Sequence, residues 1–379
     1  MLIGDKGKYL GIILGVSFAS LIMTQQPGVF LGIMSRGYSF ITDINIPDIW
    51  VMDPAVKFID DVIPLSSTQQ YRVASVTGVK WAKPLYKGGG LARLPNGQSQ
   101  KCDIIGIDDA TLIGGPSDMV YGELKNLRHG NSIIINEEGI LKKLQMTDPK
   151  TGNITYLKYG DSLELNDHRA VIVGTAKTNS TFFSNPVIYK TFSRVKDFVP
   201  GQRKMLSYVL VKAQDGESPE KVASDITKKT GLKALTKEDF KQTTYDYYVG
   251  NTGIAINFSI SVLLGFLVGA AVAGQTFYNF TQENLKYFGV LKAMGTSQKT
   301  LVLMILLQAL TVGIIGYGIG LALTTFFFWL SQSNALLAFR FTWGLMIFSA
   351  VGVGIITAIA ALMSARKVLK LEAAIVFKG

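Results

Sequence analysis

The side chains that could do chemistry in this sequence are few and far apart. The two histidines, His129 and His168, lie in loop-like segments and lack further ligands at the spacing of a metal site. We interpret both as surface residues. The single cysteine, Cys102, cannot form a disulfide within the chain, and a lone thiol is more often a small buried apolar residue than a reactive one. These residues predict neither a metal centre nor a thiol nucleophile.

The acidic pairs and the one phosphate-loop-like segment are also poor candidates. Asp108-Asp109 and Glu137-Glu138 are neighbours in sequence, so their side chains would point to opposite faces of a strand and would not share a proton. Gly295–Thr300 resembles the end of a phosphate-binding loop, but Gln298 stands where a glycine should precede the lysine. We expect no enzyme activity and no cofactor in this chain.

The charges are segregated along the sequence, with 48% hydrophobic and 17% charged residues overall. Four apolar segments are each long enough to cross a bilayer, which takes about 20 residues. We predict an α+β protein with four transmembrane helices and a large α/β domain outside the membrane between the first and second. The predicted parts are an N-terminus with the first span (1–35), the external domain (36–250), the second span (251–280), a cytoplasmic loop (281–300), the third span (301–330), the fourth span (341–365) and a cytoplasmic tail (366–379).

Basic residues near the span ends predict the orientation. They gather before the first span, in the 281–300 loop and after the fourth span: Lys6, Lys8, Lys286, Lys292, Lys299, Arg366, Lys367, Lys370 and Lys378. Both termini are therefore expected in the cytoplasm. The net charge of +11 is explained by this topology and by anionic lipid, so we do not expect a nucleic-acid partner.

The external domain alternates strand-like and helical patterns. Two helices are predicted, at Ser66–Ser75 and at Pro219–Thr230, the latter ending at Gly231. Lys87–Gly90 and Leu94–Gly97 are interpreted as turns of a hairpin. The runs rich in Ile, Val or Tyr that predict strands are Ile46–Met52, Asp103–Ile107, Ser132–Ile135, Ala170–Gly174, Val187–Tyr189 and Leu206–Val211.

A strand followed by a helix occurs near both ends of this domain. We therefore expect two half-units, about 36–108 and 202–250, to pack together, with a subdomain of about 109–201 inserted between them. Tyr245, Tyr247 and Tyr248 precede the second span, where we expect them to anchor its outer end or to contact substrate.

The 281–300 loop carries an amphipathic helical pattern, with Leu285, Phe288 and Leu291 at helical spacing. A loop that only joined two spans would not need such a pattern. We interpret it as a coupling element that enters a groove of a partner, or alternatively as a helix lying on lipid headgroups. The residues expected to make the contact are Glu283, Lys286, Phe288, Leu291, Lys292, Met294 and Gly295.

Small and polar residues inside the spans predict further contacts. Gly265 and Gly269 are four residues apart, as are Gly316 and Gly320, so each pair could allow close helix approach either in a dimer or within one subunit. Gln25 and Gln26 in the first span are either tolerated beside a proline kink or part of a polar route for substrate.

Three segments carry a family resemblance. Glu283-Asn-Leu-Lys-Tyr-Phe-Gly-Val-Leu-Lys-Ala-Met-Gly295 resembles the signature of FtsX-like permeases, the MacB-type ABC transporters, although Tyr287 replaces their usual acidic residue. The glycine-rich stretch 308–320 and the tail 364–374 are similar to the same family, with Ala373 in place of a common proline. The Asn-Phe-Thr-x-Glu-Asn-Leu wording resembles the DevC branch of exporters.

The resemblance implies a permease of the inner (plasma) membrane, with its large α/β domain in the periplasm. It would work as a homodimer with a separate ABC ATPase, on which ATP and Mg²⁺ would be bound. The resemblance also implies a periplasmic adaptor, a TolC-like outer-membrane channel, and export driven by mechanotransmission rather than by a pore between the spans. Two alternatives share the fold: an FtsX-like regulator of extracytoplasmic hydrolases, and a lipoprotein-extracting permease. The substrate cannot be deduced from these residues.

Overall fold

The computed structural model describes residues 6–147, 152–199, 205–331 and 338–369. The chain divides into two compact units. The helical unit comprises Met1–Gly32 and Gly253–Gly379, and the sheet unit comprises Ile33–Thr252.

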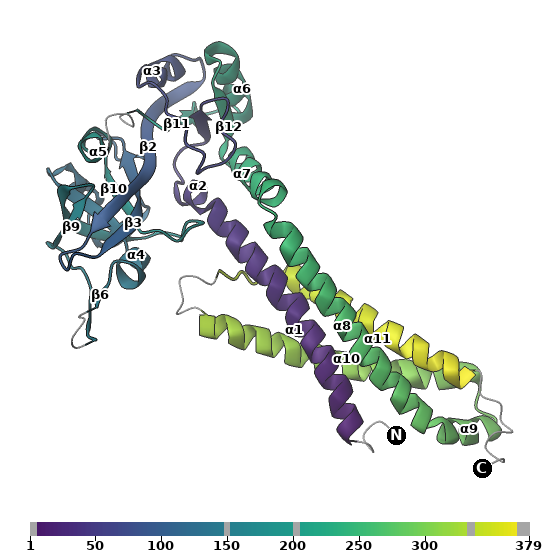
Figure 1. Ribbon diagram of the computed structural model, residues 1–379. Helices are drawn as coiled ribbons and strands as arrows, with labels where there is room; N and C mark the ends of the chain where they lie inside the picture. Colours follow the sequence, from purple (N-terminus) through teal and green to yellow (C-terminus); the bar gives the residue numbers. More distant parts are fainter. Residues whose placement is uncertain (1–5, 148–151, 200–204, 332–337, 370–379) are drawn as a thin grey trace. The chain divides into compact units, whose positions relative to one another are not determined.

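The helical unit is built from four long helices, α1 (Lys6–Gly37), α8 (Ile254–Glu283), α10 (Gln298–Ser331) and α11 (Trp343–Leu369), with the short α9 (Leu285–Ala293) between α8 and α10 (Figure 1). The four long helices are long and apolar enough to cross a membrane, judged by length and composition. The last five residues of α1 belong to the sheet unit. The core of the helical unit includes Ile12, Val16, Phe277, Phe280, Phe288, Leu301, Val353 and Ile356.

One face of each long helix remains apolar and exposed. On α8 it includes Ile256, Ile260, Leu263 and Leu267, which are 51–66% exposed and recur at helical spacing. In water such a face would be a large apolar patch, whereas in a bilayer it is matched to the lipid tails. The described helices therefore form a membrane-embedded unit.

The sheet unit is a mixed ten-stranded sheet in two lobes, of which the first joins both ends of the unit. β1 (Ile49–Met52) pairs antiparallel with β11 (Tyr208–Ala213) on one side and with β12 (Lys233–Thr236) on the other. β11 pairs in turn with β2 (Val79–Arg93). Helices α3 (Thr68–Ala74) and α6 (Pro219–Thr230) belong to this lobe, and α6 begins at the N-cap Ser218 and ends at the left-handed Gly231.

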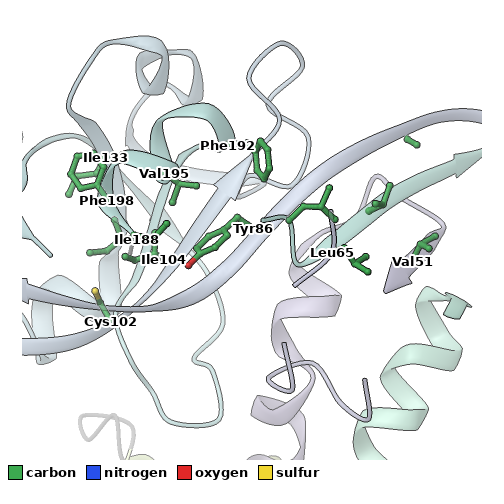
Figure 2. Close-up of a cluster of buried hydrophobic side chains, with 14 of the residues drawn as sticks. Val51, Leu65, Tyr86, Cys102, Ile104, Ile133, Ile188, Phe192, Val195 and Phe198 are labelled. Atoms are coloured by element: carbon green, nitrogen blue, oxygen red, sulfur yellow. The ribbon is translucent and has the colours of Figure 1, made fainter. Parts of the chain in front are cut away.

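The second lobe continues from β2 through β3 (Ser99–Ile107), β10 (Val187–Thr191), β5 (Ser132–Asn136), β9 (His168–Lys177) and β4 (Asp118–Gly122), with β8 (Ser162–Leu165) pairing with β2 and β9. All six sequence runs that predict strands overlap strands of the sheet. Ile104, Ile133 and Ile188 pack with Val195 and Phe198 of α5 (Phe192–Phe198) in the core of this lobe (Figure 2). The remaining elements are α2 (Ser39–Asp43), η2 (Leu124–Arg128), α4 (Glu137–Lys142), the strand pair β6 (Met146–Thr147) and β7 (Ile154–Thr155), and α7 (Lys237–Asn251).

The predicted turn at Lys87–Gly90 is wrong, because these residues lie in the middle of β2. Gly88 pairs with Ile104 and Gly90 with Cys102 across to β3. A Cβ on Gly90 would lie 2.3 Å from the Ile104 Cδ1, so this glycine permits close approach between neighbours rather than chain reversal. The reversal occurs at the second predicted turn, Leu94–Gly97, where Gly97 has φ +86°.

The long β2 also changes the expected division of the unit. Its first half pairs with β11 and its second half with β3, so one strand belongs to both lobes. β3 lies before residue 108 but pairs with the inserted strand β10. The lobes therefore meet along β2, and residue 108 does not mark a break between them.

Candidate functional site

The short helix α9 has a defined beginning and end. Asn284, between α8 and α9, donates from its side-chain amide to the Phe280 carbonyl at 2.8 Å. At the other end Gly295 has φ +95°, and the Thr296 amide donates to the Leu291 carbonyl at 3.1 Å. These features form a glycine C-cap of the Schellman type. Ser297 then begins α10, because its hydroxyl accepts from the Thr300 amide at 3.2 Å.

The structure corrects the role expected of Phe288. Its side chain is 0% exposed and packs in the core of the helical unit, with Leu285 and Leu291 packed partly buried against the same core. The apolar face that the sequence pattern identifies is therefore occupied by this chain itself. Phe288 cannot be an anchor in a groove of a partner without leaving that core.

The exposed face of α9 carries a different set of apolar side chains. Tyr287, Val290 and Met294 are 59%, 41% and 75% exposed, and their spacing of three and four residues places them on one side of the helix. We call these three residues the α9 patch. Glu283 and Lys286 are also exposed, whereas Lys292 is half-buried. Of the expected contact residues, Met294 is thus the exposed apolar one.

The four interface glycines contact α1 of the same chain. A Cβ on Gly265 would lie 2.4 Å from Ile22, and one on Gly269 would lie 2.3 Å from Ala19. On α10, a Cβ on Gly316 would lie 2.6 Å from Val16, and one on Gly320 would lie 2.5 Å from Ser20. These glycines let α8 and α10 approach α1, which favours packing within one subunit over a dimer contact at these positions.

The two glutamines of α1 are half-buried and contact each other. The Gln26 side-chain amide Nε2 donates to the side-chain oxygen Oε1 of Gln25 at 3.1 Å. This pairing offsets part of the cost of amide groups in an apolar segment. It is equally compatible with the tolerated kink and with the polar route.

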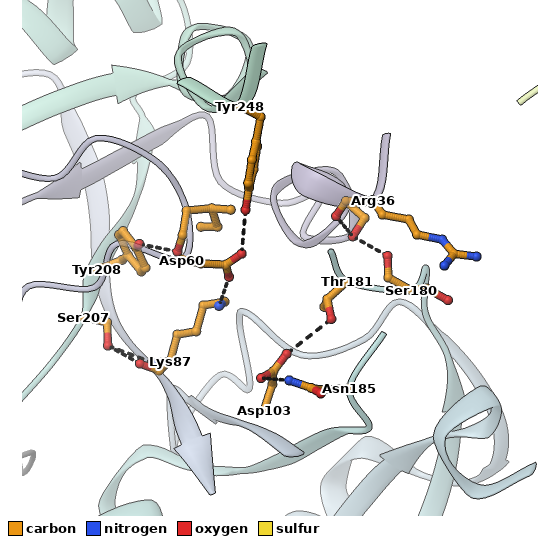
Figure 3. A network of polar contacts seen from close by, with 12 residues as sticks. Arg36, Asp60, Lys87, Asp103, Ser180, Thr181, Asn185, Ser207, Tyr208 and Tyr248 are labelled. Carbon is orange, nitrogen blue, oxygen red and sulfur yellow. Dashed lines mark hydrogen bonds and ion pairs between the residues drawn. The ribbon is translucent and has the colours of Figure 1, made fainter. Parts of the chain in front are cut away.

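A polar cluster that the sequence did not predict lies in the sheet unit, where β2 passes between the lobes (Figure 3). Lys87 is only 7% exposed and forms an ion pair and hydrogen bond with Asp60. The other Asp60 oxygen accepts from the Tyr248 hydroxyl at 3.0 Å. The Ser207 hydroxyl accepts from the Lys87 amide at 2.8 Å and donates to its carbonyl at 3.0 Å. A buried lysine is thus held by Asp60 and Ser207, and Asp60 is held in turn by Tyr248.

Asp103 lies close to this cluster but has neutral partners. It accepts from the Asn185 side-chain amide at 3.2 Å and from the Thr181 hydroxyl at 3.3 Å. Burial raises the pKa of Asp103, and the nearby Lys87 together with the two hydrogen bonds opposes that rise. The carboxyl group of Asp103 therefore has polar neighbours, but its two hydrogen-bond partners are uncharged.

Tyr248 corrects the expectation for the three tyrosines before the second span. Its side chain is 4% exposed and stacks on Phe182 with ring centroids 4.5 Å apart. Its neighbour Tyr247 stacks on Phe58 at 4.2 Å. Tyr248 is held inside the sheet unit, so it does not serve as a membrane-interface anchor.

The remaining reactive side chains have structural surroundings. Cys102 is a buried free thiol, and burial raises its pKa to about 12, which disfavours the reactive thiolate. Asp108 accepts from Thr111, whereas Asp109 accepts from Ser193, so the two carboxylates have different partners. Within the described residues, no group of three or more His, Cys, Asp or Glu is placed to hold a metal ion.

A four-helix membrane unit joined to a two-lobed sheet domain defines a class of membrane protein with one large extramembrane domain. Residues 9–229 match the family model of the MacB-like periplasmic core domain, and residues 259–373 match that of the FtsX-like permease C-terminal region. The chain therefore belongs to the family of FtsX-like permeases with a MacB-like periplasmic core domain.

Individual relatives are more distant. An uncharacterised ABC transporter permease of Methanocaldococcus jannaschii is 27% identical over 173 residues, which is 44% of this chain and 43% of that protein. The chain thus matches less than half the length of this relative. The extracellular domain of the noncanonic ABC-type transporter YknZ from Gram-positive bacteria is 14% identical, with a TM-score of 0.35 over 51% of this chain and 99% of that one. The periplasmic region of MacB from Actinobacillus actinomycetemcomitans is 13% identical, with a TM-score of 0.39 over 54% and 94%.

Two kinds of site residue could not be found from the sequence. The α9 patch was obscured because Leu285, Phe288 and Leu291 form the apolar face in the sequence pattern, and the pattern does not say which side of the helix the chain covers. The Lys87–Asp60–Tyr248 cluster joins residues that are far apart in sequence. The only local signal was a lysine followed by three glycines between apolar residues.

Proposed function

We propose that this chain is the permease subunit of a MacB/DevC-type ABC exporter in the inner membrane, with both termini in the cytoplasm. It works as a homodimer with a separate ATPase subunit, which binds ATP and Mg²⁺. ATP hydrolysis moves the sheet units by mechanotransmission, and the substrate leaves through a periplasmic adaptor and a TolC-like channel. Family membership and the four apolar helices support this proposal.

The observation that carries the proposal is the α9 patch. It lies on a short helix with a glycine C-cap between two membrane helices, and its three apolar side chains are exposed although the helix has a buried core face. An amphipathic helix that offers exposed apolar anchors at i, i+3 and i+7 fits a groove on a soluble partner. The exposed Glu283 and Lys286 add a polar rim.

The proposal predicts that the patch binds the ATPase. Tyr287→Ala should reduce the affinity of the purified permease for its ATPase by about 30-fold, since an aromatic anchor typically contributes about 2 kcal/mol. Binding can be measured by co-purification and by titration of the ATPase onto permease in lipid nanodiscs. Tyr71→Ala is a matched control, because Tyr71 is 72% exposed on α3 of the sheet unit.

An α9 helix that lies on lipid, and a chain that regulates hydrolases, would each give a different result. If α9 lies on lipid headgroups, Tyr287→Ala should leave ATPase binding unchanged and should weaken the contact between α9 and the headgroups. If the chain regulates extracytoplasmic hydrolases, a hydrolase should co-purify in place of an adaptor and channel. The first result would contradict ATPase binding through the α9 patch, and the second would contradict the exporter function.

A further inference from the structure

The sheet unit contains a cavity at the place where β2 passes from one lobe to the other. Its volume is about 330 Å³, within the range of small-molecule sites. It is lined by the centre of β2, by Asp103 in the middle of β3, and by segments that include Asp60, Thr181, Phe183 and Met205. Because both lobes contribute to its wall, a ligand bound here would contact both.

The charged groups that line the cavity carry one net negative charge, from Asp60, Asp103 and Lys87. Lys87 is already neutralised by Asp60, which also accepts from Tyr248. An incoming anion would have to compete with this buried pair, and breaking a buried ion pair is costly. Lys87 therefore does not serve well as an anion receptor.

Asp103 offers the opposite preference. Among the described residues it makes no ion pair within 4 Å, and its hydrogen bonds to Asn185 and Thr181 are long, at 3.2 and 3.3 Å. A primary ammonium carries three donors and would form a charge-assisted hydrogen bond with this carboxylate. The cavity thus has an acceptor suited to a cation.

The rest of the wall suits an apolar body. Phe183 is 66% exposed and Met205 is 37% exposed, and both line the cavity together with Val62 and Pro64. An exposed aromatic ring also attracts a cation over its face. The lining therefore combines one receptive carboxylate with aromatic and aliphatic surface.

We propose that this cavity binds a small organic ammonium compound, with the ammonium group at Asp103 and the apolar part against Phe183 and Met205. The assignment rests on the proposed function, in which the sheet units move during export, and it adds that the exported molecule is an organic ammonium compound bound by the sheet unit. Its test requires neither the ATPase nor transport.

The test is calorimetric titration of the full chain in nanodiscs with n-butylammonium chloride, sodium butyrate and 1-butanol, at equal ionic strength. We expect saturable binding of n-butylammonium and at least tenfold weaker binding of the other two probes. Asp103→Asn should lower the affinity for n-butylammonium by at least about tenfold, because hydrogen bonds to charged groups are stronger than neutral ones. Comparison of the two proteins in the same lipid cancels partition of the probe into the bilayer.

Two further variants keep the result interpretable. Phe183→Ala removes an exposed rim side chain without touching the core, and it should weaken n-butylammonium binding severalfold. Asp215→Asn is the matched control, since Asp215 is exposed in the same unit and pairs with Lys80. Absence of saturable n-butylammonium binding, preferred binding of butyrate, equal binding of all three probes, or binding that is unchanged by Asp103→Asn would overturn the assignment. Because the Tyr287→Ala experiment measures only ATPase binding, failure of one proposal is distinguishable from failure of the other.

Discussion

At the residue scale, the most unusual side chain outside the cavity is Lys190 of β10. It is 0% exposed, its Nζ donates to the carbonyls of Gly130 and Ser132 at 3.3 Å, and it lies 4.1 Å from the centre of the Phe198 ring. Burial lowers its pKa to about 8, with Arg194 acting in the same direction and Asp197 opposing. A buried cation with few partners makes the stability of this lobe depend on pH.

The sign of that dependence follows from proton binding. The ordinary lysine pKa is 10.5, so between about pH 8 and pH 10.5 the unfolded chain binds more protons at this residue than the folded chain. The free energy of unfolding should therefore rise with pH across this window, by on the order of 1–3 kcal/mol from this group. Thermal melts of wild type and Lys190→Met between pH 7.5 and 10 would measure it. A pH dependence that is the same in both proteins would contradict the prediction.

Phe288 and Tyr287 are adjacent in sequence, but truncation of Phe288 should lower the stability of the protein far more than truncation of Tyr287. Phe288→Ala removes a fully buried ring, and such changes cost about 3–5 kcal/mol in soluble protein cores. Tyr287→Ala removes an exposed ring and should change stability by about 0.5 kcal/mol or less. Melting temperatures in the same detergent would show the contrast. Equal melting temperatures for the two variants would mean that Phe288 does not pack in the helical core.

At the scale of the element, α1 is the helix against which α8 and α10 pack through glycine. A Cβ on Gly320 would lie 2.5 Å from Ser20, whereas a Cβ on Gly318 of the same helix would have no neighbour within 4 Å. Gly320→Leu should therefore separate α10 from α1 and lower the yield of folded protein, and Gly318→Leu should be tolerated. Size-exclusion profiles and melting temperatures of the two variants provide the measurement. Intolerance of Gly318→Leu alone would place a contact with another chain on that side of α10.

The sequence predicts elements well where one local pattern determines them. The apolar spans, six of the strands and helix Pro219–Thr230 follow from hydropathy, alternation and capping residues. The turn predicted at Lys87–Gly90 was wrong because glycine runs occur both in turns and in strands that other side chains approach closely. Only the packing of Tyr86 and Ile104 against these glycines distinguishes the two cases. The prediction that Phe288 contacts a partner was wrong for a related reason. Helical periodicity identifies the apolar face of α9 but cannot say whether the same chain or a partner covers it.

At the scale of the whole molecule, the proposed mechanotransmission requires a stiff connection between the two units. α7 ends at Asn251 and α8 begins at Ile254, so the connection is very short. A flexible Gly-Ser linker inserted after Gly253 should leave ATP hydrolysis by the assembled transporter intact and should abolish export. The control is the same linker inserted after Gly97, which lies in an exposed turn where a Cβ on Gly97 would have no neighbour within 4 Å. Export that survives the insertion after Gly253 would favour a substrate route through the spans, past Gln25 and Gln26.

The shared strand β2 has a mechanical consequence. It is hydrogen-bonded to β11 along its first half and to β3 along its second, and the bonds of antiparallel ladders run perpendicular to the strands. A pull directed along β2 therefore loads each ladder in shear, so that its bonds must rupture together rather than one after another. Tension between the lobes would be resisted by many bonds at once, and the change of partner at Leu85–Tyr86 divides that load between two ladders. The sheet domain is thus strong in stretching along β2.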